Sequence, residues 1–153
     1  MKQTELFLFD NVVDIDKDIL QFKNREIKAK QIFTINEIDK KIAYEFIRKY
    51  HYLKDAKFFA KYSYGLYIDK ILVGCSTFSN PQGISAMKSW FGLPNSNQSV
   101  LELSRLCMLP KLNGTNATSY LLGNSMKMLK QKEVKAVITL ADDSRHVGSI
   151  YQV

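Results

Sequence analysis

The sequence SVLELSRLCMLPKLNGTNATSYLLGNSMKMLKQKEVKAVITLA, residues 99–141, decides the fold class of this chain. We predict a strand over residues 99–109, closed by Pro110, and then a loop that contains Gly114. Residues 118–131 are predicted to form a helix, because apolar residues recur there at helical spacing. A second, buried strand is expected over residues 134–141. A strand, a helix and a further strand in this order indicate a parallel crossover.

An antiparallel hairpin is predicted on the N-terminal side of this stretch. Residues 63–68 and 71–78 are rich in aromatic and β-branched side chains, and only Asp69 and Lys70 connect them. A helix is expected over residues 37–50, with Asn36 as its N-cap, and a short strand within residues 4–15. The hairpin and the crossover together predict an α/β (α+β) fold, in which helices flank a mixed sheet. Residues 79–98 are expected to form a long loop, and residues 146–152 a short helix.

Length and composition restrict the class of protein. A chain of 153 residues predicts a single domain, with residues 1–35 as a basic N-terminal strand or extension and residues 36–153 as the core. Its apolar runs are much shorter than the roughly 20 residues that span a bilayer, and the N-terminus does not resemble a signal peptide. Cys75 and Cys107 are expected to be small buried apolar groups in a reducing compartment, so we predict a cytoplasmic protein.

The charge is strongly basic and unevenly distributed. The formal net charge is +7, and Lys and Arg outnumber Asp and Glu across residues 17–61. A basic region of this kind suits a polyanion, because phosphate contacts release condensed counterions. A solvated lysine-rich surface without a partner is the alternative interpretation.

Several polar residues lie where chemistry is expected. His51 and His146 fall at the ends of predicted elements, where a structural role is the alternative. In the strand at 99–109, alternation predicts Glu102 and Ser104 on one face and Arg105 on the other, with Leu103 and Cys107. A buried arginine requires a carboxylate partner or a ligand.

Three further groups of residues complete the candidate site. The loop and helix start after residue 112 offer free N–H groups to an anion such as a pyrophosphate, although they match neither a Walker loop nor a dinucleotide motif. Asp142 follows the predicted last strand, where it could act as a base, a metal ligand or a loop cap, and Tyr151 lies nearby. Lys88, Trp90 and Phe91 form a basic and aromatic segment that suits stacking on a nucleic-acid base, or else anchors the loop to the core.

Five blocks of the sequence, in order, resemble the Mom family of phage proteins. They are KYHYL (49–53), YSYGLYIDKILVGCSTFSNP (62–81), LELSRLCMLP (101–110), NATSYLLGNSMKMLK (116–130) and ADDSRHVGSIYQ (141–152). Proteins of this family convert adenine in DNA to a carbamoylmethyl-type derivative, which protects the DNA from restriction. The resemblance covers about residues 42–152. It implies a fold similar to the GNAT-type N-acetyltransferases and a location in the host cytoplasm for a phage-encoded protein.

The resemblance also implies roles for individual residues. The catalytic candidates are His51, Tyr52, Ser104, Arg105, Asp142, His146 and Tyr151. An acetyl-CoA or related acyl-CoA pyrophosphate is expected at Asn116, Thr118, Ser119 and Gly123, although the usual glycine signature of the superfamily is degenerate here. Iron is a further implied cofactor, with His51, Tyr52 and Asp142 as ligands. Double-stranded DNA is the implied partner, and His51 or Asp142 would act as the base and Arg105 as the electrostatic stabiliser.

The chain ends at Val153, where the family continues with further strands. We therefore expect a C-terminally truncated fold, with a sheet edge that a second copy or another partner covers. Two other functions stay open at this point. One is an acetyltransferase that acts on a small amine or a protein lysine, and the other is a non-catalytic DNA-binding relative with the same fold.

Overall fold

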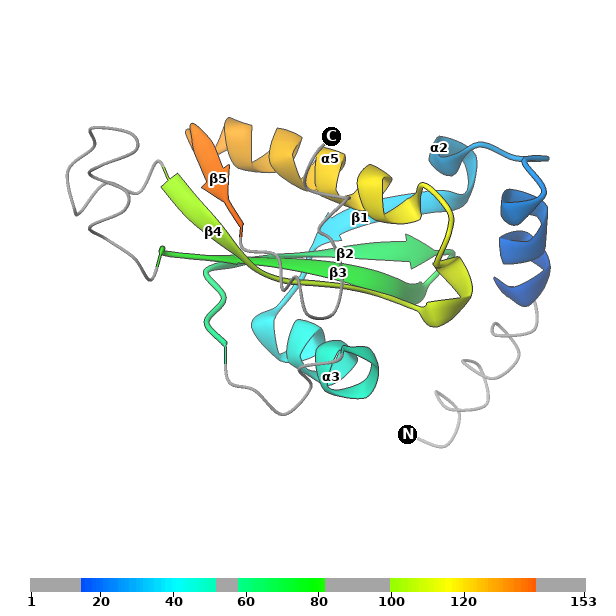
Figure 1. Cartoon of the computed structure of the whole chain (residues 1–153), viewed down its shortest axis with the longest axis horizontal. Helices are drawn as coiled ribbons and strands as arrows, with labels where there is room; N and C mark the ends of the chain where they lie inside the picture. The colour runs from blue at the N-terminus through cyan, green and yellow to red at the C-terminus, as the bar shows by residue number, and fades with distance from the viewer. Residues whose placement is uncertain (1–14, 52–57, 82–99, 140–153) are drawn as a thin grey trace.

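A five-stranded mixed sheet lies at the centre of the computed structural model, which describes residues 15–51, 58–81 and 100–139 (Figure 1). The spatial order of the strands is the same as their order in the chain. The strands are β1 (Phe33–Glu37), β2 (Tyr62–Ile68), β3 (Ile71–Ser79), β4 (Val100–Met108) and β5 (Ala136–Ile138). Neighbouring strands are antiparallel except for β4 and β5, which are parallel. The predicted mixed sheet is therefore confirmed, together with its hairpin and its parallel crossover.

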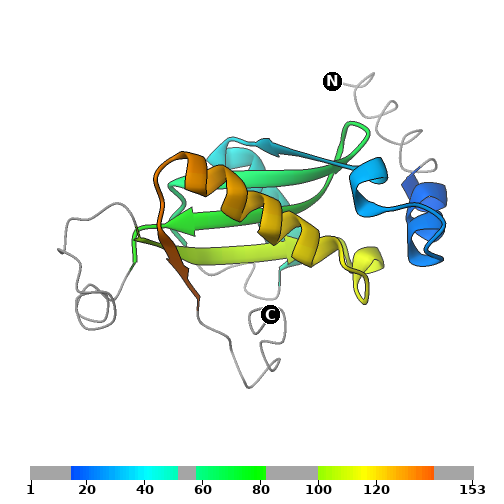
Figure 2. The ribbon, with the colours of Figure 1, turned by 90° about the horizontal axis from the view of Figure 1, so that it is seen from above.

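Helices cover both faces of the sheet. Helix α5 (Ala117–Gln131) packs on one face and α3 (Lys40–Tyr50) on the other. Seen from above, α5 runs across the strands, and its far end turns directly into β5 (Figure 2). We call the two sides of the sheet the α5 face and the α3 face. Residues 15–23 form a helix, α2 (Ala29–Ile32) is a single turn, and Pro110–Leu112 form a 3-10 turn before α5.

The apolar core lies on both faces of the sheet, because helix and sheet each bury one apolar side. On the α5 face, Leu121 and Leu129 of α5 are fully buried. They pack against residues of the strands that include Leu66, Phe78 and Leu101. On the α3 face, the buried residues are Ala43, Phe46, Ile47, Phe58, Cys75 and Cys107. Both cysteines are buried free thiols, as the sequence predicted.

The start of α3 differs from the prediction. Asn36 and Glu37, which we expected to cap and begin the helix, belong to β1, and the helix starts at Lys40 after the N-cap Asp39. Residues 33–37 pair along their whole length with β2, from Phe33 opposite Ile68 to Glu37 opposite Tyr64. The ladder hydrogen bonds and the buried Phe33 therefore override the local capping signal.

Other predicted boundaries shift or lie outside the described residues. Helix α5 begins one residue before the predicted 118–131, and β5 is shorter than the predicted 134–141. Most of the strand predicted within residues 4–15, most of the loop at 79–98 and the whole helix at 146–152 lie outside the described ranges. Within those ranges, the structure has no helix that is both long and apolar enough to cross a membrane.

Candidate functional site

His51 occupies the C-cap of α3, and the helix holds it in a buried position. Its backbone N–H donates to the carbonyl of Ile47 at 2.9 Å, and only 8% of the residue is exposed. Burial, followed by the nearby Arg105 cation, lowers the pKa of His51 from 6.5 to about 4. The imidazole is therefore neutral at neutral pH, in a form that accepts a proton.

A β-bulge in β4 determines where Ser104 and Arg105 lie. Thr77 of β3 is opposite Arg105, but the next residue, Phe78, is opposite Leu103, so Ser104 is the extra residue. A bulge of this kind bends the strand and redirects its side chains. The predicted alternation is wrong here, because Leu103 packs in the cluster on the α5 face and Cys107 in the cluster on the α3 face.

Ser104 lies at the centre of a hydrogen-bond network on the bulge. Its Oγ lies 2.8 Å from the carbonyl oxygen of Phe59, 3.0 Å from that of Thr77 and 3.2 Å from the Thr77 hydroxyl. A serine hydroxyl donates only one hydrogen bond at a time. The consistent arrangement is that Thr77 donates to Ser104, which donates to the carbonyl of Phe59. The bulge is thus tied to the segment that follows α3 in the chain.

Arg105 lies on the same face of the sheet, where its charge acts on the buried histidine. Its guanidinium donates from Nη1 to the carbonyl of Ser104 at 2.7 Å and lies 5.0 Å from the centre of the Phe58 ring. The Phe58 ring stacks on Tyr44 of α3 at 4.4 Å, and the Tyr44 hydroxyl donates to the Phe58 carbonyl at 2.6 Å. An aromatic face and backbone carbonyls partly compensate the cost of placing a cation here.

His51, Ser104 and Arg105 therefore meet on the α3 face of the sheet. We call the set His51, Phe58, Phe59, Thr77, Ser104 and Arg105 the bulge cluster. Sequence reasoning missed Thr77, Phe58 and Phe59, since none of them has a distinctive motif. The sequence carries one signal for Phe59. It directly follows Phe58, and two consecutive large aromatic residues in an extended segment do not both point to the same buried side. Phe59 is 67% exposed, although its carbonyl is held by Ser104.

The predicted anion site lies at the start of α5, after the bulged strand and the 3-10 turn. Asn116 is the N-cap, and Thr118 and Ser119 are in the first turn, which has no acidic residue. Within the described residues, the Asn116 side chain makes no capping hydrogen bond, while Thr115 Oγ1 accepts from the N–H of Ala117 at 3.2 Å. The first turn therefore keeps N–H groups and a positive dipole end for an anion.

Gly123 does not share this position. It lies further along α5, about 9 Å from the helix start at 1.5 Å per residue, and a Cβ placed on it would have no neighbour within 4 Å. The structure thus brings Asn116, Thr118 and Ser119 together and leaves Gly123 apart.

The remaining candidates lie outside the described residues. Tyr52, Asp142, His146 and Tyr151 are among them, as are Lys88, Trp90 and Phe91, so their predicted roles stay predictions. Within residues 15–51, 58–81 and 100–139, no group of three or more His, Cys, Asp or Glu side chains could hold a metal ion. The positive charge of Arg105, which acts on His51 and helps to lower its pKa, opposes a bound cation at this point.

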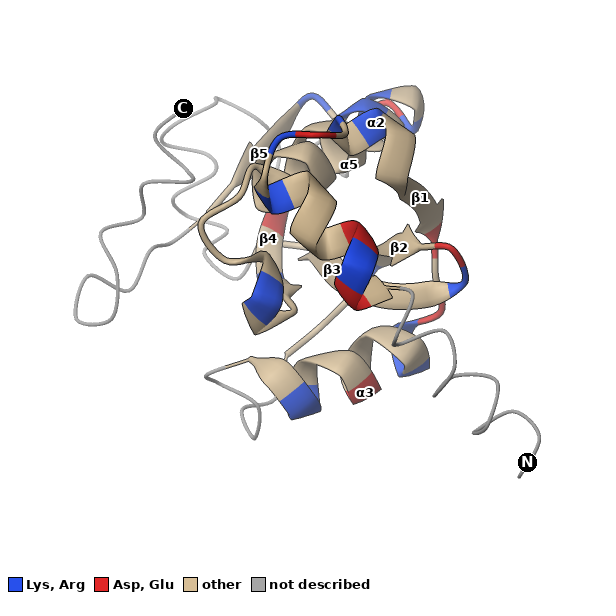
Figure 3. Cartoon of the chain, turned by 90° about the vertical axis from the view of Figure 1, so that its right-hand side faces the viewer, with Lys and Arg blue, Asp and Glu red and all other residues tan. Residues whose placement is uncertain are grey.

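The basic residues of the N-terminal half are spread over several surfaces. Lysines and arginines lie on the helix at residues 15–23, on α2 and on α3, with acidic residues among them (Figure 3). Lys111 pairs with Asp16 at 2.5 Å on this side of the molecule. The predicted basic half is therefore a mixed surface in the described residues.

This arrangement of sheet and helices matches the folds of solved acetyltransferases, among them a GNAT family acetyltransferase from Brucella melitensis. Solved structures with this fold match most of the chain. An aminoglycoside acetyltransferase from an uncultured soil metagenomic sample has a TM-score of 0.56 at 10% identity, covering 82% of this chain and 88% of its own. The ribosomal-protein-S18-alanine N-acetyltransferase of Escherichia coli has a TM-score of 0.56 at 11% identity, covering 79% and 75%.

The N-acetylglutamate synthase of Neisseria gonorrhoeae, solved with coenzyme A and L-arginine, has a TM-score of 0.55 at 11% identity. It matches 79% of this chain, which spans only 26% of the synthase. The model of the Mom protein family matches residues 32–153. This chain belongs to the Mom protein family. The search of curated proteins found no matching sequence.

Proposed function

We propose that the protein is a DNA-modifying transferase that converts adenine in DNA to an N6-modified, carbamoylmethyl-type base and so protects the DNA from restriction. The observation that carries the proposal is that His51, at the end of α3, and Arg105, at the β4 bulge, lie on the same face of the sheet, in a chain that belongs to the Mom family. These residues come from blocks that are distant in the sequence, and the sequence alone predicts both as site residues.

The chemistry of adenine supports this use of the cluster. The N6 lone pair is delocalised into the ring, so reaction there requires an activated donor, a proton acceptor and access to the base outside the stack. The neutral imidazole of His51 is a weak base, with a pKa of about 4, so it accepts a proton from N6 only once N6 has gained positive charge in the reaction. Arg105 provides a fixed positive charge for the charge that develops on the donor. The carbonyl of Phe59 accepts a hydrogen bond from Ser104, and its largely exposed side chain offers a stacking surface to a base.

An acyl-CoA is the donor class that fits the described residues. The first turn of α5 offers backbone N–H groups and no acidic side chain, which suits a pyrophosphate. Asn116, Thr118 and Ser119 would hold it. Attack of N6 on the thioester would attach the carbonyl carbon of the acyl group to N6 and release the CoA thiol. A carbamoylmethyl group is attached through a methylene carbon, so its formation requires a reaction beyond this acyl transfer. Similar folds were solved with coenzyme A in the Neisseria synthase and with acetyl-CoA in an acetyltransferase from Brucella melitensis. Among the described residues, no group of three or more His, Cys, Asp or Glu side chains is placed to hold iron.

The test is mass spectrometry of nucleosides from cells that express the protein. We expect a deoxyadenosine derivative of increased mass, and its loss in Arg105→Gln. The control is Lys23→Gln, which removes an exposed positive charge far from the cluster. Unmodified nucleosides from cells that contain folded wild-type protein would contradict the proposal, and DNA binding without modification would favour a non-catalytic relative.

A second function is favoured by the activities named for the similar structures, which are N-acetyltransferases of an aminoglycoside and of a protein alanine. An enzyme of that kind would acetylate a free amine in the absence of DNA. Turnover of small amines or peptides with acetyl-CoA, unaffected by added DNA, would support it over base modification.

A further inference from the structure

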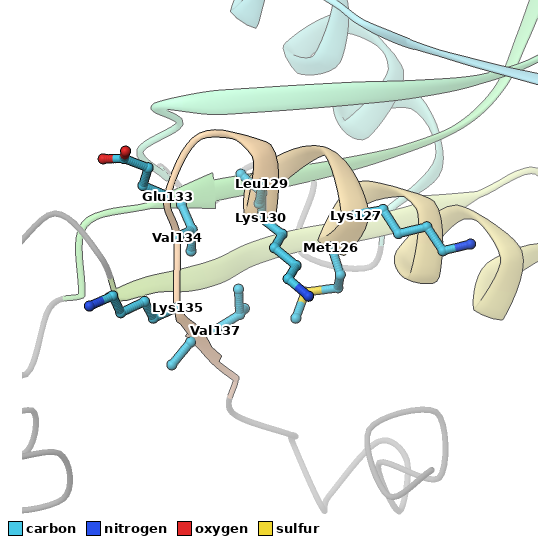
Figure 4. Close-up of a pocket in the computed structure, with 9 residues that line it drawn as sticks. Met126, Lys127, Leu129, Lys130, Glu133, Val134, Lys135 and Val137 are labelled. Carbon is cyan, nitrogen blue, oxygen red and sulfur yellow. The ribbon is translucent and has the colours of Figure 1, made fainter.

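A groove of about 980 Å³ lies between the C-terminal half of α5 and β5 (Figure 4). Its floor is apolar, because Leu129 is buried and Val134 and Val137 are partly buried beside it. Met126 extends this floor outward and is 38% exposed. The groove lies on the α5 face and at the β5 edge, so it is separate from the bulge cluster on the α3 face.

Three lysines surround this floor. Lys127 and Lys130 come from α5 and Lys135 from the segment before β5, and all three are exposed. Among the described residues, no carboxylate pairs with any of the three. Glu133, the one acidic residue of the lining, points away from the lysine side chains in the close-up (Figure 4). Lys132 points elsewhere, since it pairs with Glu37 at 3.3 Å and lies 4.7 Å from the Tyr62 ring centre.

The arrangement of charge favours an anionic ligand. Lys127 and Lys130 extend from the same helix in different directions, and Lys135 adds a third positive charge from the other wall (Figure 4). Positive charges spread along a groove favour an extended anion over a compact one. A volume of this size is also larger than a single phosphate requires. Cations that alternate with apolar surface match a chain of phosphates, sugars and bases.

We propose that this groove, defined by Met126, Lys127, Lys130, Val134, Lys135 and Val137, binds the phosphodiester backbone of nucleic acid. Under the proposed function the nucleic acid is the substrate DNA, and the groove holds a part of it away from the base that reacts. The identity of the ligand as DNA rests on the proposed function. Its chemical class, a phosphodiester chain, rests on the groove alone.

The test compares two triple variants by fluorescence anisotropy with labelled DNA. The groove variant is Lys127→Gln, Lys130→Gln and Lys135→Gln, and the control is Lys17→Gln, Lys23→Gln and Lys30→Gln. The control removes the same charge from exposed positions on the helix at 15–23 and on α2, at the opposite end of the molecule. Glutamine keeps a good helix propensity, and thermal unfolding checks that both variants fold.

We expect the groove variant to bind DNA about tenfold or more weakly than the wild type, and its salt slope to fall by about 2 to 3 between roughly 50 and 200 mM salt. The control should stay within about threefold of the wild type. Equal losses in the two variants would mean that net charge alone matters, and would overturn the proposal. So would unchanged binding by the groove variant, or a wild type that binds neither duplex nor single-stranded DNA.

The result also separates this inference from the proposed function. If the wild type binds DNA through the groove and no modified nucleoside forms, the proposed function fails and the groove proposal stands. If nucleosides are modified and the groove variant binds like the wild type, the groove proposal alone fails. Tighter binding to single-stranded than to duplex DNA of the same sequence would support a groove for an unstacked strand.

Discussion

His51 combines burial with a cationic neighbour, and both disfavour its protonated form. The folded protein binds a proton at this imidazole only near pH 4, because the pKa falls from 6.5 to about 4, whereas the unfolded chain binds it near pH 6.5. Between these values the unfolded state holds more protons, so stability rises with pH. We expect acidification from pH 7 to pH 4 to remove up to about 3 kcal/mol of stability through this residue.

Urea unfolding at several pH values measures this contribution. The control is His51→Gln, which cannot titrate, so its stability should depend less on pH across this range. Carboxylates titrate in both proteins and cancel in the comparison. Parallel pH dependences for the wild type and His51→Gln would show that the imidazole is not the source.

The side chain of Phe59 is predicted to stack on a base of the DNA, and a substitution can separate this role from the stability of the fold. Its ring is 67% exposed, so Phe59→Ala should leave the free energy of unfolding within about 0.5 kcal/mol of the wild type. If a base stacks on this ring, removal of the ring should weaken the binding of DNA by about 1 to 3 kcal/mol. We therefore expect DNA affinity and adenine modification to fall about tenfold. Leu20→Ala is the matched control, because Leu20 is 59% exposed on the distant helix at 15–23, and an equal loss there would contradict the stacking role.

Two glycines show that the elements differ in how well they tolerate a substitution of glycine by alanine. Gly65 lies in β2, where a Cβ would come within 2.8 Å of Leu72, 2.9 Å of Tyr67 and 3.0 Å of Ile38. Gly65→Ala should destabilise the protein by about 1 to 3 kcal/mol, because the side chains of Leu72, Tyr67 and Ile38 must shift from their packed positions. In α5, a Cβ on Gly123 meets nothing within 4 Å, so Gly123→Ala should stabilise by about 0.5 to 1 kcal/mol.

Thermal or urea unfolding of the two variants gives the comparison directly. Gly123→Ala also tests the predicted cofactor role of this residue. If the affinity for acyl-CoA is unchanged in Gly123→Ala but reduced by substitution of Asn116, the anion site is confined to the first turn of α5. A stabilised Gly65→Ala would contradict the packing described for β2.

The elements that the sequence predicted well have strong local patterns. The hairpin of β2 and β3 follows from aromatic and β-branched runs around a two-residue turn, in which Asp69 adopts a φ of 52° that aspartate tolerates better than most residues. Helix α5 follows from its apolar spacing. Strand β1 was not predicted, because Asn36 and Glu37 resemble a helix start and only the pairing with β2 reveals the strand.

The sequence predicted which residues belong to the site better than it predicted how they are arranged. His51, Ser104 and Arg105 were candidates, yet the strict alternation assumed for β4 placed Arg105 on one face with Leu103. The polar–apolar pattern of a strand does not reveal where a bulge lies. The extra residue changes which face the side chains point to only for the residues that follow it. Thr77 and Phe59 join the cluster through hydrogen bonds to Ser104, which depend on the register of β3 and β4 and cannot be read from single residues.

At the scale of the whole molecule, the sheet separates two surfaces. The bulge cluster lies on the α3 face, while the lysine groove lies between α5 and β5. β5 has β4 as its one neighbour in the described sheet, which leaves its other edge beside the groove. Catalysis and backbone binding should then depend on different residues, joined only through the sheet.

This separation predicts the behaviour of combined variants. Arg105→Gln should leave the Kd for DNA within about threefold of the wild type, because its guanidinium is engaged with the Ser104 carbonyl and the Phe58 ring. The variant that combines Arg105→Gln with the three groove substitutions should bind DNA like the groove variant, since effects at distant sites add within about 0.5 kcal/mol. Anisotropy titrations of Arg105→Gln, the groove variant and the combined variant, each compared with the wild type, measure these effects. A combined loss much larger than the sum would mean that one DNA contact spans both faces, and the two surfaces would then have to be treated as a single site.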